Sequence, residues 1–142
     1  MMPPMRESTF WSQVKAKLVD DETHLCRLEN SSGSGMPDVN GCRRGAERWI
    51  ELKMFHGQRL HFRASQRSWM LSRKKVGGKV WVLARKDDEI FLWAAWHLLE
   101  SPSKVEKEGK SFSIKYDDMP GAYFRDSKPF AWDKLRDAIF GQ

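Results

Sequence analysis

The run from Arg48 to Met54 is the segment that most restricts how this chain can fold. Its apolar residues alternate with charged ones, and this predicts a β-strand because successive side chains of a strand point to opposite faces. Glu51 and Lys53 then share one face, while Ile50 and Leu52 occupy the other. Two charged side chains on such a strand indicate either an exposed ion pair, worth at most about 1 kcal/mol, or a functional cleft.

The chain has 142 residues, which fits one domain with a substantial core. Its longest apolar run, residues 90–99, reaches about half the length that a membrane span needs. The N-terminus has no basic segment leading into an apolar stretch, so no secretory signal is expected. With only Cys26 and Cys42 available for a disulfide, both are predicted to be reduced. We therefore expect a cytoplasmic protein, in the host cytoplasm if the chain is viral.

Apolar periodicity and turn residues predict an alternation of helices and strands. Ser65 is the expected N-cap of the second helix, and Gly41 and Gly45 are expected to bound the turn between two strands. The expected elements are a helix over 6–18, strands over 24–30, 36–42 and 48–54, a loop over 56–61, a helix over 65–75, strands over 79–85 and 89–93, a loop over 101–110, a strand over 111–116 and a helix over 130–140.

This order predicts an α/β fold with a central mixed β-sheet flanked by helices. Residues 1–100 are expected to form the core, and residues 101–142 a C-terminal extension within the same single domain. The aromatic segment 123–140 is expected to pack on the core or to supply apolar surface for a dimer interface. Trp132, Leu135, Ile139 and Phe140 are the candidates for that surface.

Positive charge is concentrated in the central third of the chain. Thirteen basic and two acidic residues lie between Arg43 and Lys86, a local balance of +11, whereas the whole chain carries +6. Such a concentration indicates either a solvated basic face or binding to an anionic partner, of which nucleic acid is the commonest. No P-loop or G-x-G-x-x-G motif is present, so no nucleotide cofactor is expected.

Asp38 follows Pro37 at the start of an expected strand. If this strand lies beside the strand of Glu51 and Lys53, two carboxylates and an ammonium group converge. Mg²⁺ prefers oxygen ligands and retains several waters, so such a site suits it. The alternative is that Asp38 merely caps a turn. The four histidines have no zinc-like spacing with the two cysteines.

Pro37-Asp38, followed thirteen residues after Asp38 by Glu51-Leu52-Lys53, resembles the signature of the PD-(D/E)xK nuclease superfamily. The flanking residues, at 35–39, 49–53 and 66–69, look like the VRR-NUC branch and its small phage relatives. The resemblance covers about residues 7–93. It implies a restriction-endonuclease-like core in the order α-β-β-β-α-β, with Asp38 and Glu51 as ligands of Mg²⁺ (Mn²⁺ is expected to substitute) and Lys53 positioning the attacking water.

The resemblance also implies two supporting residues. A glutamate on the first helix helps to hold the metal or its waters in this family, and Glu7 matches because it falls on the apolar stripe with Phe10. Glu29 is the competing candidate. Gln66 matches the glutamine that leads the following helix, where it is expected to hydrogen-bond phosphate or a catalytic group; a satisfied buried amide is the alternative.

Basic side chains near these motifs are the predicted phosphate contacts. They are Arg43, Arg44, Arg59, Arg63, Arg67, Arg73, Lys74 and Lys75. The function implied by the resemblance is a homodimeric, Mg²⁺-dependent endonuclease for branched DNA such as Holliday junctions, leaving 5′-phosphate and 3′-hydroxyl ends. The alternatives are a non-catalytic nucleic-acid-binding protein of the same fold and a nuclease for linear duplex or flap DNA.

Overall fold

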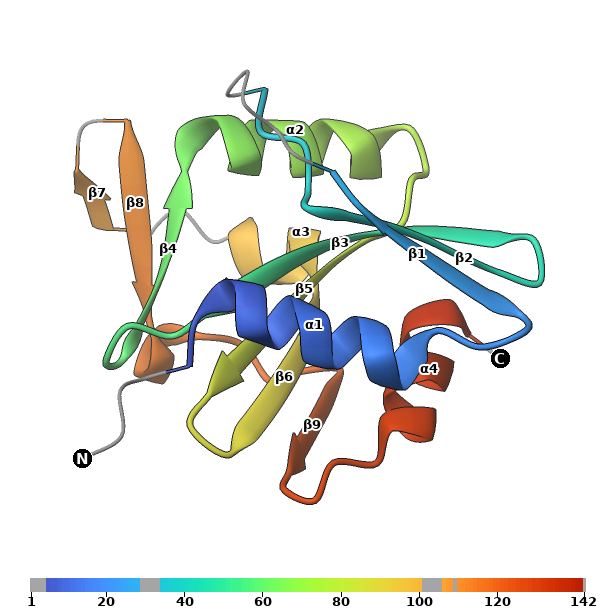
Figure 1. The fold of residues 1–142 in the computed structure, drawn as a ribbon. Coiled ribbons are helices and arrows are strands. Elements are labelled where there is room, and N and C mark those ends of the chain that lie inside the picture. Colours follow the sequence, from blue (N-terminus) through green and yellow to red (C-terminus); the bar gives the residue numbers. More distant parts are fainter. Residues whose placement is uncertain (1–4, 29–33, 101–105, 109, 142) are drawn as a thin grey trace.

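A six-stranded sheet forms the centre of the computed structural model, which describes residues 5–28, 34–100, 106–108 and 110–141 (Figure 1). Its spatial order is β1-β2-β3-β5-β6-β9. β3 and β5 are parallel, and every other neighbouring pair in this sheet is antiparallel. The strands are β1 (Thr23–Arg27), β2 (Val39–Arg43), β3 (Ala46–Met54), β5 (Val80–Lys86), β6 (Glu89–Ala94) and β9 (Phe124–Ser127).

Helices cover both faces of this sheet. The helices are α1 (Glu7–Leu18), α2 (Ala64–Lys75), α3 (Ala95–Leu99) and α4 (Trp132–Phe140). One core lies between the sheet and α1 with α4, and the other lies between the sheet and α2 with α3. The apolar stripe of α1, with Phe10, Val14 and Leu18 fully buried, confirms the helical period expected there.

A second, three-stranded sheet in the order β4-β8-β7 packs beside α2 (Figure 1). Its strands are β4 (Arg59–Arg63), β7 (Glu106–Glu108) and β8 (Ser111–Lys115), and a 3₁₀ turn, Tyr116–Asp118, follows β8. Leu60 and Phe62 of β4 point into the core on the α2 side of the central sheet. The expectation of a loop over 56–61 is therefore wrong for Arg59 and the residues after it. The short alternating run of β4 acquires its pairing from β8, about fifty residues later in the chain.

The predicted α/β class is confirmed, with a central mixed sheet flanked by helices. The expected order α-β-β-β-α-β is present from α1 to β5, with β4 inserted before α2. Three details are wrong. Gly41 lies inside β2, opposite Arg48, and Arg63 rather than Ser65 is the N-cap of α2. Within the expected loop 101–110, Glu106–Glu108 form β7, which acquires its pairing from β8. The part of the expected strand 24–30 beyond Leu28, and residues 101–105 of the expected loop, lie outside the described residues.

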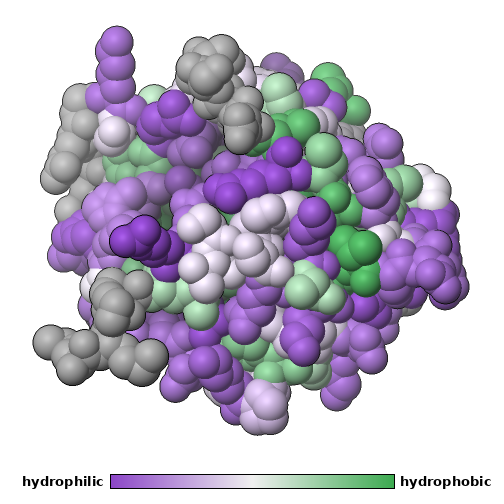
Figure 2. All heavy atoms as spheres, in the orientation of Figure 1, coloured by the Kyte–Doolittle hydropathy of each residue, from purple (hydrophilic) through white to green (hydrophobic). Residues whose placement is uncertain are grey.

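The described C-terminal residues add to both the sheet and a helix layer. β9 pairs with β6 at the edge of the central sheet, and α4 packs against α1. Leu135, Ile139 and Phe140 are at most 1% exposed, so three of the four candidates for an apolar dimer surface are unavailable. The face shown in Figure 2 is mostly hydrophilic, with apolar residues in small separate patches. Among the residues described, none of the helices is both long and apolar enough to cross a membrane.

Candidate active site

β3 places Glu51 and Lys53 on the α2 side of the sheet, as the alternation of its sequence predicts. Ile50 and Leu52 point to the opposite side and are at most 1% exposed within the core under α1 and α4. Glu51 is itself only 2% exposed. Burying an ionisable carboxyl is costly unless it has a partner or a ligand, so Glu51 is not the exposed ion-pair residue of the alternative interpretation.

Asp38 directly precedes β2 and lies beside this site. Val39 pairs with Ile50 across the sheet, which brings the preceding Asp38 beside the backbone of Leu52. The backbone N–H of Leu52 donates to Asp38 Oδ2 at 3.1 Å. The charge of Asp38 raises the pKa of the Glu51 carboxyl, which shows that the two groups lie close together. The structure therefore brings the two predicted carboxylates together.

Gln66 links the acidic and basic members of the site. Its Nε2 donates to Glu51 Oε1 at 3.3 Å, and its Oε1 accepts from Lys53 Nζ at 3.2 Å. The same Oε1 accepts from the backbone N–H of Arg63 at 2.8 Å, which caps the start of α2. Gln66 is thus a satisfied buried amide and a connector between Glu51 and Lys53 at once, so both sequence interpretations describe it.

Phe62 is a residue of the site that sequence reasoning missed. The ammonium group of Lys53 lies 4.7 Å from the centre of the Phe62 ring, a cation–π arrangement. Phe62 in turn stacks on Phe112 of β8, with ring centres 5.4 Å apart. The alternation of apolar and polar residues from Arg59 to Arg63 was the signal that could have found it.

Glu7 lies at the start of α1, half-buried, near Asp38. Burial and then the charge of Asp38 raise the pKa of its carboxyl, while Lys53 lowers it. The competing residue, Glu29, lies outside the described residues. Within the described ranges, no group of three or more His, Cys, Asp or Glu side chains is arranged to hold a metal ion. Asp38 and Glu51 are accordingly the central pair, with Glu7 beside them.

The chemistry of this pair fits a divalent cation. Glu51 Oε2 is buried and has no hydrogen-bond partner among the described residues. Burial first, and then the charge of Asp38, raise the pKa of Glu51 well above its usual value. A cation between the two carboxylates would supply the missing partner and offset the repulsion. Mg²⁺ prefers oxygen ligands and is commonly bound through one or two carboxylates.

Replacing Glu51 with glutamine is expected to stabilise the metal-free protein at high pH. A raised carboxyl pKa gives stability that is present below the ordinary value of 4.5 and is lost as the pH rises through the folded-state pKa. Glutamine does not ionise, so E51Q should melt at least about 2 °C above wild type at pH 8 and close to it at pH 4. Thermal unfolding in EDTA measures this, and a lower melting temperature of E51Q at pH 8 would contradict it.

The approach to Asp38 depends on Gly35. Gly35 has φ +82°, and a Cβ there would lie 2.0 Å from the carbonyl oxygen of Ser65. Gly35→Ala is therefore expected to cost more than the roughly 1–3 kcal/mol that a positive φ alone costs. Gly45→Ala is the matched control, since Gly45 has the same φ of +82° but no atom within 4 Å of the added Cβ. Equal urea midpoints for the two variants would contradict the close packing.

Several predicted phosphate contacts lie on or near α2. Arg63, Lys74 and Lys75 are exposed, and Lys74 lies 4.7 Å from the ring centre of Trp96. Arg73 lies over Trp69 at 4.4 Å and over Trp49 at 5.8 Å. Two other cations also make hydrogen bonds within the fold: Arg67 donates to the carbonyl of Leu99, and Arg59 donates to Ser113.

Arg43 and Arg44 do not fit the predicted contact surface. Arg43 is 8% exposed and donates to Thr23 and Asp20. Arg44 is exposed but forms an ion pair with Glu22. Asp20 and Glu22 lie in the turn between α1 and β1, and their carboxylates pair with these two guanidinium groups, so neither Arg43 nor Arg44 is free to contact phosphate.

Comparison with solved structures identifies the fold of the chain. No family model matches the chain, and no curated protein matches it in sequence. A solved structure that does match is Hjc of Archaeoglobus fulgidus, described as a Holliday junction resolvase from an archaeal hyperthermophile. The match has a TM-score of 0.57 and 17% sequence identity, and it covers 80% of this chain and 91% of Hjc. The chain therefore has the fold of an archaeal Holliday junction resolvase.

Proposed function

We propose that this protein is a Mg²⁺-dependent endonuclease that hydrolyses phosphodiesters of branched DNA, such as a Holliday junction. The observation that carries the proposal is that Oε2 of the buried Glu51, beside Asp38, has no hydrogen-bond partner among the residues that the structure describes. The likeness of fold to a resolvase supports the same conclusion. The motif around Pro37-Asp38 and Glu51-Leu52-Lys53, which resembles the VRR-NUC branch, favours a small stand-alone nuclease of that type.

Asp38 and Glu51 would hold the metal ion, and Glu7 would bind the ion or its waters. A bound Mg²⁺ polarises a phosphoryl oxygen and lowers the pKa of a water molecule. Mn²⁺ offers the same preference for oxygen ligands and should substitute. Asp38 is held in place by the backbone of Leu52, so one metal ligand is fixed by the sheet itself.

Lys53 is the group that would orient the attacking water and stabilise the charge that develops on the phosphate. Gln66 and the ring of Phe62 hold its ammonium group in position. Because Gln66 also donates to Glu51, movement of either charged residue would disturb the other. Gln66 is thus a positioning residue. The products of the proposed hydrolysis would carry 5′-phosphate and 3′-hydroxyl ends.

A homodimer completes the proposal. A four-way junction has two symmetric strands to cut, and one chain carries one Asp38/Glu51/Lys53 centre. A two-fold dimer provides two such centres at a fixed separation. The buried residues of α4 do not form its interface, whereas Trp96 and Tyr123 are large apolar residues that remain exposed.

Cleavage of a matched set of DNA substrates tests the choice of substrate. A four-way junction, a flap and a linear duplex of the same sequence are incubated with the protein in Mg²⁺, and the solution mass is measured by light scattering. The proposal expects a dimer that makes paired nicks in the junction and cuts the duplex far more slowly. Equal cutting of all three by a monomer would support the alternative of a general duplex nuclease. Junction binding without cleavage would favour the non-catalytic alternative.

A further inference from the structure

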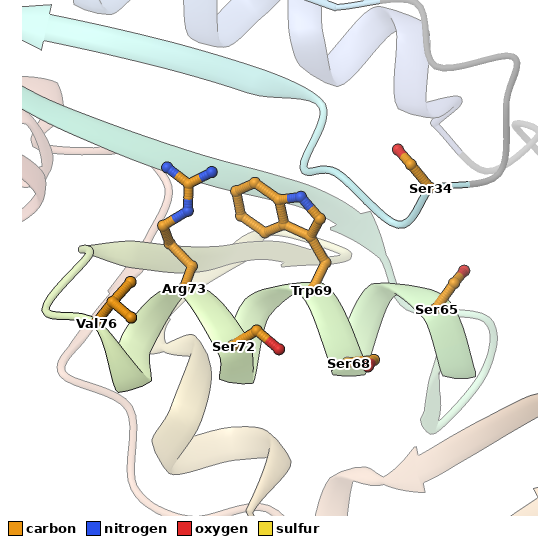
Figure 3. A pocket seen from close by; sticks show the side chains of 7 residues that line it. All are labelled: Ser34, Ser65, Ser68, Trp69, Ser72, Arg73 and Val76. Carbon is orange, nitrogen blue, oxygen red and sulfur yellow. The ribbon is translucent and has the colours of Figure 1, made fainter.

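An open groove of about 420 Å³ runs along one side of α2 (Figure 3). Its lining consists of Ser34, Ser65, Ser68, Trp69, Ser72, Arg73 and Val76. Four of these residues carry hydroxyl groups, one is a cation, and none is acidic. In Figure 3, Ser34 and Ser65 lie at one end of the groove and Val76 lies at the other.

The groove begins at the candidate active site. Ser65 directly precedes Gln66, which hydrogen-bonds Glu51. Ser34 belongs to the segment that leads to Asp38, and Gly35 packs against the backbone of Ser65. The end of the groove near Ser65 therefore lies close to the residues proposed to hold the metal ion.

From that end the groove extends along α2 toward Val76, the residue after the helix. Trp49 lies two residues before Glu51, on the same face of β3, and its ring contacts Trp69 with centres 5.4 Å apart. Arg73, one helical turn beyond Trp69, lies over both rings. Moving away from the active site, one meets first the Glu51–Gln66 contact, then the Trp49–Trp69 contact, and then Arg73.

The charge of this region favours an anionic ligand. No acidic residue occurs from Leu52 to Lys86, and α2 carries only cations among its ionisable residues. Serine hydroxyls donate to phosphate oxygens without reading base sequence. The lining spans eleven residues of helix, about 16 Å at 1.5 Å per residue. That length corresponds to roughly five base steps of a DNA strand.

We infer that this groove binds the sugar–phosphate backbone of the DNA strand that flanks the cut, with the serine hydroxyls and Arg73 as its phosphate contacts. The inference rests on the proposed function, because it assigns the path of that enzyme's substrate. It makes α2 a substrate-binding element as well as a support for Gln66. The contacts are independent of sequence, which suits an enzyme that selects DNA by branched shape.

Ser68→Glu tests the groove, because Ser68 is exposed on α2 and a carboxylate there would repel phosphate. Ser12→Glu is the matched control, since Ser12 is an exposed serine in the middle of α1, also a twelve-residue helix. Binding to a fluorescent four-way junction is measured in EDTA by anisotropy. The groove predicts binding weaker by about tenfold for Ser68→Glu, from a lost hydrogen bond to phosphate and added repulsion, and unchanged binding for Ser12→Glu.

Cleavage assays with the same proteins separate the proposal of a DNA-binding groove from the proposal of nuclease activity. With Mg²⁺ and saturating protein, the cleavage rate of Ser12→Glu should match wild type, whereas below saturation Ser68→Glu should cleave more slowly in proportion to its weaker binding. If wild type cleaves and Ser68→Glu binds as tightly as wild type, the groove is wrong and the nuclease stands. If wild type binds but never cleaves while Ser68→Glu binds weakly, the nuclease is wrong and the groove stands. A change in solution mass of Ser68→Glu would instead show that the groove contacts a second copy of the chain, which would overturn the inference.

Discussion

Asp38→Asn and Glu51→Gln are each expected to lower the rate of DNA cleavage by at least about 10³-fold, because each removes a negatively charged oxygen donor from the metal site. Both changes keep the size of the side chain. Gln at position 51 can still accept from Gln66, so the fold around α2 should survive. The measurement is the single-turnover rate on a labelled four-way junction in Mg²⁺, together with affinity for the same DNA.

Glu47→Gln is the control for this result. Glu47 is an exposed carboxylate on the same strand, β3, near the turn to β2. Its removal changes the net charge by the same amount, so its cleavage rate should equal that of wild type. Affinity should be unchanged or slightly higher in all three variants, because removing a carboxylate reduces repulsion from phosphate. Full turnover by Glu51→Gln would refute the assigned site.

Affinity for DNA is expected to fall steeply with salt. Lys and Arg that neutralise phosphates release condensed counterions, and six contacts with duplex would give a loss on the order of 10³-fold between about 50 and 200 mM salt. Cations on and around α2 can supply these contacts even without Arg43 and Arg44. Anisotropy titrations of Glu51→Gln, which binds without cutting, would measure the slope.

Single charge changes locate the contacts. Lys75→Gln, at the exposed end of α2, should reduce the salt slope by about one, whereas Lys15→Gln on α1 should leave it unchanged. A flat response of the parent protein to salt would show that the basic central third faces a ligand other than nucleic acid. Equal slopes for the two lysine variants would place the DNA away from α2.

The residues at the centre of the site could be predicted from local sequence, because the two-residue period of a strand and the 3.6-residue period of a helix determine which side chains share a face. Alternation along β3 places Glu51 and Lys53 together, and the helical stripe of α1 brings Glu7 to the same edge. Pro37-Asp38 precedes the adjacent strand, so one antiparallel pairing suffices to complete the cluster. These relationships span short stretches of chain, and side-chain direction follows directly from the backbone period.

Features that depend on distant pairing could not be predicted in the same way. Phe62 reaches Lys53 because β4 pairs with β8, and a five-residue strand carries too little alternation to reveal this alone. The hydrogen bonds of Arg43 depend on the β1–β2 pairing, which sets Thr23 opposite it. The face that α4 buries was ambiguous because an apolar stripe fits a core and a subunit interface equally well. In the structure, Leu135, Ile139 and Phe140 of this stripe pack in the core of their own domain.

We propose that the buried Glu51 and the partly exposed Asp38 together form a metal-dependent nuclease site. The most direct test incubates wild type and Glu51→Gln, purified side by side, with a strand-labelled four-way junction in Mg²⁺ or in EDTA. We expect nicks with 5′-phosphate and 3′-hydroxyl ends for wild type in Mg²⁺, and intact DNA in the other three reactions. An intact junction with wild type in Mg²⁺, or equal nicking by Glu51→Gln, would contradict it.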